Sequence, residues 1–126
     1  TTSCFINDII NSCSEKKKLD LPFKIDLQWP YIYVSDVVSS IYSCLFYKNS
    51  HRYSYNVGGP DFPSYKQILN LISTEFPKSN VTFSKRNKIS ERKNFSTTKI
   101  KKDINWEPKF NIQKGLNDYF KNLNTE

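Results

Sequence analysis

The side chains that most often carry enzyme chemistry are few in this sequence and are poorly spaced for it. Histidine occurs once, at His51, and the cysteines Cys4, Cys13 and Cys44 form no Cys-x-x-Cys pair. A catalytic triad would therefore have a single candidate base, and neither a zinc site nor a disulfide framework has enough ligands at suitable spacing. His51 lies in a polar stretch between predicted elements, so we interpret it as a solvated loop residue rather than a pH-tuned base.

Phosphate-binding loops and paired carboxylates give no stronger signal. The only glycines are Gly58, Gly59 and Gly115, and they cannot form the glycine-rich turn of a dinucleotide-binding fold or of a P-loop. Asp36 and Asp61 could act as an acid–base pair, but their separation does not follow from the sequence. We interpret the two adjacent glycines as a permissive turn and Asp36 as a carboxylate at a helix start. The chain is therefore predicted to contain no catalytic residue and no metal site.

The length and composition indicate one domain. A chain of 126 residues is enough for a single core, so we expect one domain spanning residues 1–126. The aromatic share of 15% means that rings must fill much of this core. No stretch approaches the roughly 18 apolar residues that a membrane span requires, and no secretory leader is recognisable. Together with the reduced cysteines, this predicts a cytoplasmic protein without a membrane partner.

The positive charge offers an alternative function. The formal net charge is +7, and the cations cluster at residues 16–18, 85–93 and 99–102. A basic surface of this kind can bind phosphates, so a non-enzymatic binding module for nucleic acid or a protein is the alternative interpretation. The lysines fall at predicted helix ends and loops, where solvated cations are common, and we do not expect nucleic acid to be the main partner.

The spacing of apolar residues changes halfway through residues 30–45. Residues 31–34 are β-branched and aromatic, which predicts a short strand. Val37, Ile41 and Leu45 then recur every four residues, which predicts one face of a helix that Ser35 would cap.

The rest of the chain alternates between helical and strand patterns. Ser64 and Gln67 fit a capping box, and Asn111 is the expected N-cap of the last helix. Residues 84–95 are predicted to be a polar, basic connector. Further helices are predicted over residues 4–14, 64–76, 98–104 and 111–123, and further strands over 19–23, 52–57 and 81–83.

The order of these motifs resembles a known family. The sequence YIYVSDVV is followed by YNVGG, a Ser-capped helix, STTKIKKDINWEP and a terminal helix that contains Gly-Leu. From about Thr2 to Leu123, this order is similar to the C-terminal part of the extended short-chain dehydrogenases, the NAD-dependent epimerase/dehydratase family of nucleotide-sugar enzymes. The resemblance implies an α/β fold: a small mixed lobe that lacks most of the Rossmann domain and is a fragment of a longer chain.

The resemblance also tells us what to expect of the chemistry. None of the eight tyrosines is followed four positions later by Lys, so the family's catalytic Tyr-x-x-x-Lys motif is absent. We therefore expect the chain to bind no cofactor by itself and to be inactive alone. NAD(P) would be held by a missing Rossmann lobe, in cis or in trans, and the full-length parent would be a sugar-nucleotide epimerase, dehydratase or related oxidoreductase. The implied ligand is a sugar-nucleotide-like small molecule.

Three substrate-binding positions follow from the resemblance. The family's aromatic residue that opens the strand matches Tyr31, and the phosphate-binding Arg two residues earlier is replaced by Trp29. A second family Arg falls on Arg86, which could donate a bidentate pair to phosphate oxygens. The acidic residue usually found three positions later is Ile89 here. Because two of four expected contacts are altered, another polar substrate within the superfamily stays open.

Overall fold

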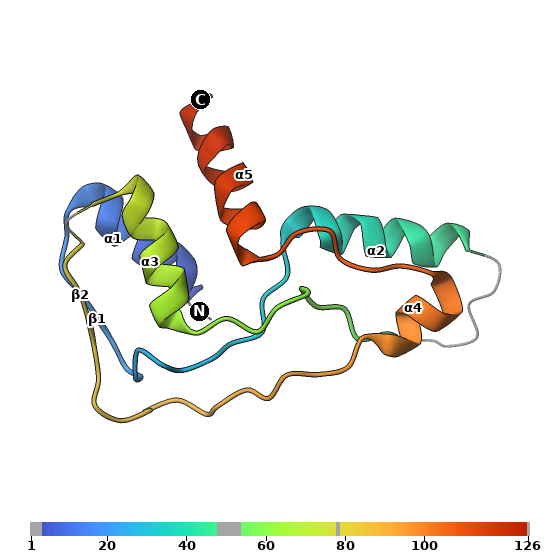
Figure 1. Cartoon of the computed structure of the whole chain (residues 1–126), viewed down its shortest axis with the longest axis horizontal. Coiled ribbons are helices and arrows are strands. Elements are labelled where there is room, and N and C mark those ends of the chain that lie inside the picture. The colour runs from blue at the N-terminus through green and yellow to red at the C-terminus, as the bar shows by residue number, and fades with distance from the viewer. Residues whose placement is uncertain (1–3, 48–53, 78, 126) are drawn as a thin grey trace.

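The computed structural model describes residues 4–47, 54–77 and 79–125. In this part of the chain the helices are α1 (Phe5–Glu15), α2 (Val34–Phe46), α3 (Tyr65–Glu75), α4 (Thr98–Ile104) and α5 (Ile112–Asn124), and the strands are β1 (Leu19–Leu21) and β2 (Val81–Phe83). The elements α1, α3, β1 and β2 gather at one end of an elongated molecule and α2 and α4 at the other, with α5 between them (Figure 1). His51, Arg52 and Tyr53 lie outside the described residues.

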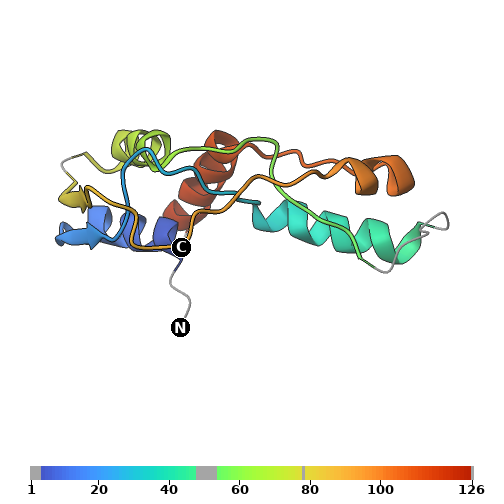
Figure 2. The ribbon, with the colours of Figure 1, turned by 90° about the horizontal axis from the view of Figure 1, so that it is seen from below.

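Extended segments connect the two ends, and backbone hydrogen bonds join two of these segments. Residues 27–31 run beside residues 59–65: the N–H of Trp29 donates to the carbonyl of Pro63, and that of Gly59 to the carbonyl of Tyr31. Gln28 and Ser64 form an isolated antiparallel bridge. A third segment, residues 84–97, returns from β2 to α4 along the same length (Figures 1 and 2).

The sheet and most helix boundaries agree with the sequence pattern. The strands β1 and β2 are parallel, with Leu19 opposite Val81 and Leu21 opposite Phe83. At the start of α3, the Ser64 hydroxyl accepts the N–H of Gln67 while the Gln67 amide accepts the N–H of Ser64, which confirms the predicted capping box. The Asn111 side chain caps α5, as expected.

The strand predicted over residues 31–34 is wrong. These residues form no ladder, and α2 already begins at Val34, with Tyr33 as its N-cap instead of Ser35. The Tyr33 carbonyl accepts the N–H groups of Asp36 and Val37, so the helix begins two residues earlier than the Ser-Asp pair suggested. β-branched and aromatic residues alone could not distinguish an extended lead-in from a paired strand.

The strand predicted over residues 52–57 is also not formed in its described part. Residues 54–57 are extended but form no ladder with any other described segment. Their alternation is nonetheless present, because Tyr55 and Val57 pack inward while Ser54 and Asn56 are exposed. The described residues of this segment thus have the alternating burial of a strand without forming a ladder.

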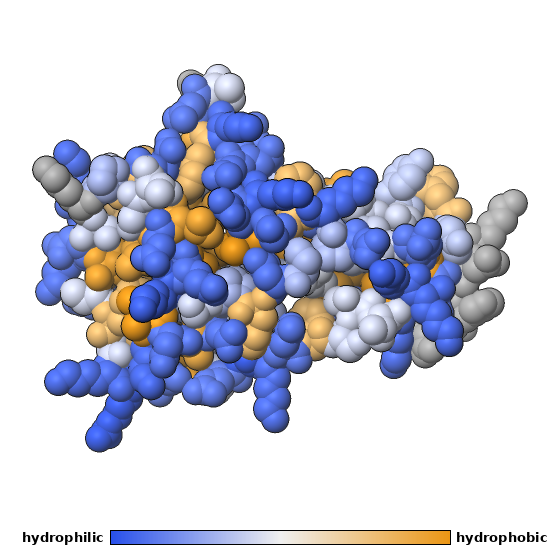
Figure 3. All heavy atoms as spheres, viewed as in Figure 1, coloured by the Kyte–Doolittle hydropathy of each residue, from blue (hydrophilic) through white to orange (hydrophobic). Residues whose placement is uncertain are grey.

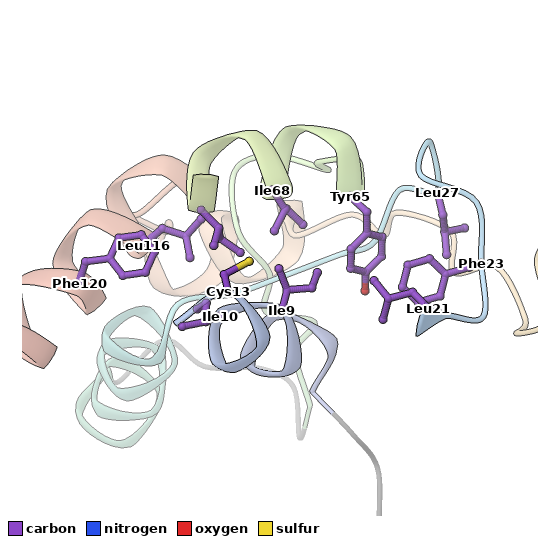
Figure 4. Packing of buried hydrophobic residues seen from close by; sticks show 11 residues of the cluster. Ile9, Ile10, Cys13, Leu21, Phe23, Leu27, Tyr65, Ile68, Leu116 and Phe120 are labelled. Atoms are coloured by element: carbon purple, nitrogen blue, oxygen red, sulfur yellow. The ribbon is translucent and has the colours of Figure 1, made fainter. Parts of the chain in front are cut away.

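The main core lies between α1, α3, α5 and the β1 end. Phe23 and Tyr65 stack at its centre with ring centroids 4.3 Å apart, and Phe5 approaches Phe23 edge-on at 5.0 Å. The side chains converge from three helices and the segment after β1 (Figure 4), and apolar atoms are visible between α3 and α5 on the surface (Figure 3). The buried members are Ile9, Ile10, Cys13, Leu21, Phe23, Leu27, Tyr65, Ile68, Ile72, Leu116 and Phe120.

A second, smaller cluster holds the other end. Ile100, Ile104 and Trp106 are buried there, and Cys44 of α2 packs against them together with Tyr55 and Val57. This apolar environment of Cys44, and the burial of Cys13 in the main core, agree with the expected free thiols. None of the described helices is both long and apolar enough to cross a bilayer.

Helix α2 is turned with its polar side inward. Asp36 is 2% exposed and Ser40 is buried. Of the three residues that the sequence predicted to share one helix face, Val37 is half-buried, whereas Ile41 and Leu45 are exposed, as is Val38. The Asp36 carboxylate accepts the backbone N–H of Lys109 through Oδ1 and that of Phe110 through Oδ2, each at 2.9 Å. Asp36 is therefore in the first helical turn, as expected, but its main role is to tie the segment before α5 to α2.

We predict that Asp36→Ala lowers the free energy of unfolding by about 2 to 3 kcal/mol, because it leaves two backbone donors without their acceptor. Asp36→Asn keeps one amide oxygen as an acceptor and should cost less. Asp26→Ala, which removes an exposed ion pair with Lys24 at 3.6 Å, is the matched control and should change little. Urea unfolding checks this order, and equal losses for Asp36→Ala and Asp26→Ala would contradict it.

Candidate functional site

Tyr31 lies in the extended segment between the two ends, where it faces two hollows. One is an apolar cavity of about 180 Å³ between the start of α1 and the start of α5, and the other, of about 380 Å³, lies against Gly58, Gly59 and Thr98. The Tyr31 hydroxyl is 2.6 Å from the hydroxyl of Tyr65. The aromatic residue predicted from the sequence to contact a ligand is thus half-buried, and its polar end is already bound within the protein.

Tyr31 and Tyr33, which line the smaller cavity, and Tyr65, which is hydrogen-bonded to Tyr31, all have raised pKa values. Burial, and then the neighbouring Tyr65, raise the pKa of Tyr31 far above its ordinary value. Burial raises the pKa of Tyr65 to about 12, although its hydrogen bond with Tyr31 works against this rise. Burial also raises the pKa of Tyr33 to about 12, with a further contribution from its hydrogen bond to Asp118. At neutral pH these hydroxyls can orient a ligand by hydrogen bonding, but they cannot act as general bases.

Tyr33 joins α5 to the extended segment that carries Tyr31. Its hydroxyl donates to Oδ2 of Asp118 at 2.5 Å, and its ring lies against the helix backbone at Gly115. A Cβ at position 115 would be 3.1 Å from the Tyr33 ring, so glycine allows this close approach. Asp61 adds a second tie, because its Oδ2 accepts the N–H of Ile112 at 3.1 Å.

The Gly-Gly pair serves close approach rather than an unusual turn. No glycine in the described chain has a positive φ, which corrects the interpretation of Gly58 and Gly59 as a turn that other residues would strain. A Cβ on Gly59 would lie 2.5 Å from the carbonyl oxygen of Tyr31, the atom that accepts the Gly59 N–H. A side chain here would push the segment that carries Tyr31 out of place.

Trp29 carries a cation that the sequence did not predict. The guanidinium carbon of Arg92 lies 5.5 Å from the centre of the Trp29 ring. Beside them is a polar hollow of about 400 Å³, whose lining includes the cations of Lys24, Arg92 and Lys93. The position at which the family has an arginine is thus tryptophan in sequence, yet an arginine from the connector lies over it in space.

Arg86 and Ile89 lie apart from the Trp29–Tyr31 segment in different environments. Arg86 is exposed and is not part of the lining of the hollow beside Trp29, and no described contact brings its guanidinium to Tyr31. Ile89 packs against the main core. The connector is held instead by Asn87, whose side-chain oxygen accepts the N–H of Lys24 at 2.9 Å. Of the three predicted site residues, Trp29 and Tyr31 share one segment and Arg86 stands apart.

Sequence reasoning missed Arg92, Tyr65 and Tyr33. Arg92 is one of many cations in a basic connector, and only the path of residues 84–97 shows which of them reaches Trp29. In sequence, Tyr65 is only the residue that follows the predicted cap Ser64. Its hydroxyl partner, Tyr31, is 34 positions away and cannot be predicted from the local pattern. Among the described residues, no group of three His, Cys, Asp or Glu side chains could hold a metal ion.

The comparisons with known proteins identify the fold. No protein-family model and no curated protein sequence matches the chain. Solved structures do match it, among them the ADP-L-glycero-D-manno-heptose-6-epimerase of Helicobacter pylori, with a TM-score of 0.83, 18% identity and coverage of 100% of this chain and 39% of that one.

Two further enzymes are similar over nearly the whole chain. The UDP-glucose 4-epimerase of Thermotoga maritima, solved with UDP-glucose, has a TM-score of 0.79 at 20% identity and covers 98% of this chain and 41% of its own. The dTDP-glucose 4,6-dehydratase of Bacillus anthracis, solved with NAD, has a TM-score of 0.73 at 24% identity and covers 93% of this chain and 39% of its own.

These matches confirm the resemblance and the fold class expected from the sequence. The chain spans about two-fifths of the length of the enzymes it matches. Its small mixed α/β architecture is similar to that of part of each of these epimerases and dehydratases.

The tyrosine pair gives a pH-dependent prediction. The folded state keeps the Tyr65 proton up to about pH 12, whereas the unfolded chain releases it near 10. The stabilisation is therefore complete below about pH 10 and is lost as the pH rises toward 12. We predict that Tyr31→Phe combined with Tyr65→Phe flattens the fall in the free energy of unfolding over this range, measured by urea unfolding at stepped pH. Tyr42→Phe on the outer side of α2 is the control, and a double variant that loses stability as steeply as the wild type would contradict the assignment.

Proposed function

We propose that this chain is the substrate-binding portion of an NAD(P)-dependent nucleotide-sugar epimerase/dehydratase-like protein and is inactive alone. The observation that carries the proposal is the match of essentially the whole chain to such enzymes, at a TM-score of 0.83 for one of them, over only two-fifths of their length. Of the similar enzymes, one was solved with UDP-glucose and one with NAD. By this proposal, the part of the enzyme that this chain does not cover would help to hold both molecules. By this proposal the protein is cytoplasmic and its substrate is a sugar-nucleotide-like molecule.

The chain's own residues support a binding role more than a reactive one. The pKa values of Tyr31 and Tyr65 are raised, so both are neutral at pH 7, and the sequence lacks the family's Tyr-x-x-x-Lys pair. Hydride transfer would be supplied by NAD(P) held on a second lobe, in cis or in trans. The contribution of this chain would be to position and enclose the substrate.

Trp29, Tyr31 and Arg86 are the proposed substrate-binding residues, and the geometry adds Arg92 to them. A guanidinium over an indole can still direct N–H groups toward a phosphate. Lys24, Lys93, Asp26 and Glu91 line the adjoining hollow, and Lys24 is paired with Asp26 at 3.6 Å, so Arg92 and Lys93 are the cations proposed to meet an anion there. Arg86 would have to reach the substrate from the exposed connector and has no such support.

A binding measurement tests the proposal and ranks the two arginines. We predict that UDP-glucose binds the 126-residue chain in calorimetry, and that Arg92→Ala weakens this binding about tenfold, the loss expected for one charge-assisted phosphate contact. Arg86→Ala should weaken it less, and Lys121→Ala, on the exposed side of α5, should leave it unchanged.

The same samples test whether the chain is inactive alone. With NAD and UDP-glucose added, no epimerised product is expected by chromatography, because neither the cofactor loop nor a proton-transferring pair is encoded. Turnover by the purified chain would contradict the proposal. Absence of UDP-glucose binding, together with steeply salt-dependent binding of duplex DNA, would favour the basic binding module instead.

A further inference from the structure

The ring of Phe95, near the end of the connector, packs against the backbone of Gly58. A Cβ at position 58 would lie 2.9 Å from Cε2 and 3.1 Å from Cζ of Phe95, which is closer than the distance at which carbon atoms attract each other. Gly58 is buried, whereas Phe95 is 40% exposed, so the ring lies over a glycine that solvent hardly reaches. The absence of a side chain at position 58 is what allows this contact.

The neighbouring Gly59 holds the segment that carries Trp29. Its N–H donates at 2.8 Å to the carbonyl of Tyr31, which is two residues after Trp29. Phe95, in turn, is three residues after Arg92. Two adjacent glycines therefore contact the segment behind the indole and the segment behind the guanidinium, and this fixes how the two segments lie against each other.

The other end of the connector is held by hydrogen bonds of Asn87. Its side-chain oxygen accepts the N–H of Lys24 at 2.9 Å, and its side-chain nitrogen donates to Oε1 of Glu91 at 2.7 Å. The connector runs from there toward α4 (Figures 1 and 2). Arg92 thus follows directly on one anchored stretch and precedes a second anchor, Phe95, by only three residues.

We infer that Phe95 is a positioning residue for Arg92. By packing on Gly58 it ends the connector at a fixed point, and so it holds the Arg92 guanidinium beside the Trp29 ring. Phe95 is not part of the lining of the hollow beside Trp29, so it acts on a ligand there only through Arg92. The consequence for a ligand rests on the proposed function: a guanidinium that is held in place loses less conformational entropy when it binds a phosphate.

Nuclear magnetic resonance on the 126-residue chain tests the inference without a ligand. The Nε–H resonance of Arg92, identified by its loss in Arg92→Lys, should be displaced by the ring current of Trp29. We expect Phe95→Ala and Gly58→Ala each to move it toward the shift of a solvated arginine, because the added methyl at position 58 would displace the ring. Phe46→Ala, which removes an exposed ring on α2, is the matched control and should leave the resonance unchanged.

The double variant of Gly58→Ala and Phe95→Ala separates positioning from a general loss of structure. Apart from the Phe95 ring, the nearest atom to a Cβ at position 58 is Cγ2 of Thr97, at an ordinary contact distance of 3.8 Å. The φ of Gly58 is not positive either, so alanine fits there once the ring is gone. The two effects should therefore not add, and the double variant should have the Arg92 resonance of Phe95→Ala alone.

Calorimetry with UDP-glucose tests the consequence for binding. We expect Phe95→Ala to weaken binding about tenfold, as Arg92→Ala does, and the two substitutions together to weaken it no further. Phe95→Leu, which keeps an apolar side chain on Gly58, should restore most of the affinity. A merely structural role of Phe95 would lower stability in urea unfolding without making its effect depend on Arg92.

Three results would overturn the inference: a wild-type Arg92 resonance without a ring-current shift, a resonance that Phe95→Ala leaves in place, or losses of affinity that add. Each would mean that Arg92 takes its position without Phe95. The resonance does not depend on a ligand. If the wild-type chain binds no UDP-glucose, the proposed substrate is rejected, and the displacement of the Arg92 signal in Phe95→Ala still decides whether Phe95 positions Arg92.

Discussion

The arrangement of α2 and α5 depends on the hydrogen bonds that the buried Asp36 carboxylate accepts. It accepts two consecutive backbone N–H groups, from Lys109 and Phe110, and so joins the first turn of α2 to the segment that leads into α5. A buried charge is tolerated only when it is well hydrogen-bonded, and these two donors provide that. By fixing which side of α2 faces inward, the same contact forces the apolar side outward.

The candidate site is built on a second constraint, the pairing of two extended segments. The Tyr31 carbonyl receives the Gly59 N–H so closely that no side chain fits at position 59, and Tyr65 holds the Tyr31 hydroxyl from the other side. These contacts position the Trp29–Tyr31 segment between two packed ends. The segment so positioned presents the Tyr31 hydroxyl, bound to Tyr65, and the Trp29 ring with Arg92 beside it.

The sequence predicted the features that depend on residues close together in the chain, namely helix caps and the positions of short strands. The Ser64 capping box, the Asn111 cap and the individual strands β1 and β2 follow from residues close together in the chain, and the structure contains each of them. The failures come from information that is not local. Residues 54–57 alternate without forming a ladder among the described residues, Ile41 and Leu45 of α2 are exposed, and Arg92 reaches Trp29 only through the course of the connector. Periodicity placed Ile41 and Leu45 on one side of α2 but could not show that the Asp36 contacts turn the opposite, polar side inward.

Chemical-shift mapping on one ¹⁵N-labelled sample of the chain tests the central claim most directly, because it separates substrate binding from cofactor binding residue by residue. The account predicts that UDP-glucose shifts the backbone and indole resonances of Trp29, the backbone resonance of Tyr31 and those of the connector around Arg92, while NAD shifts none. Shifts caused by NAD, or a response to UDP-glucose confined to residues away from this segment, would contradict it.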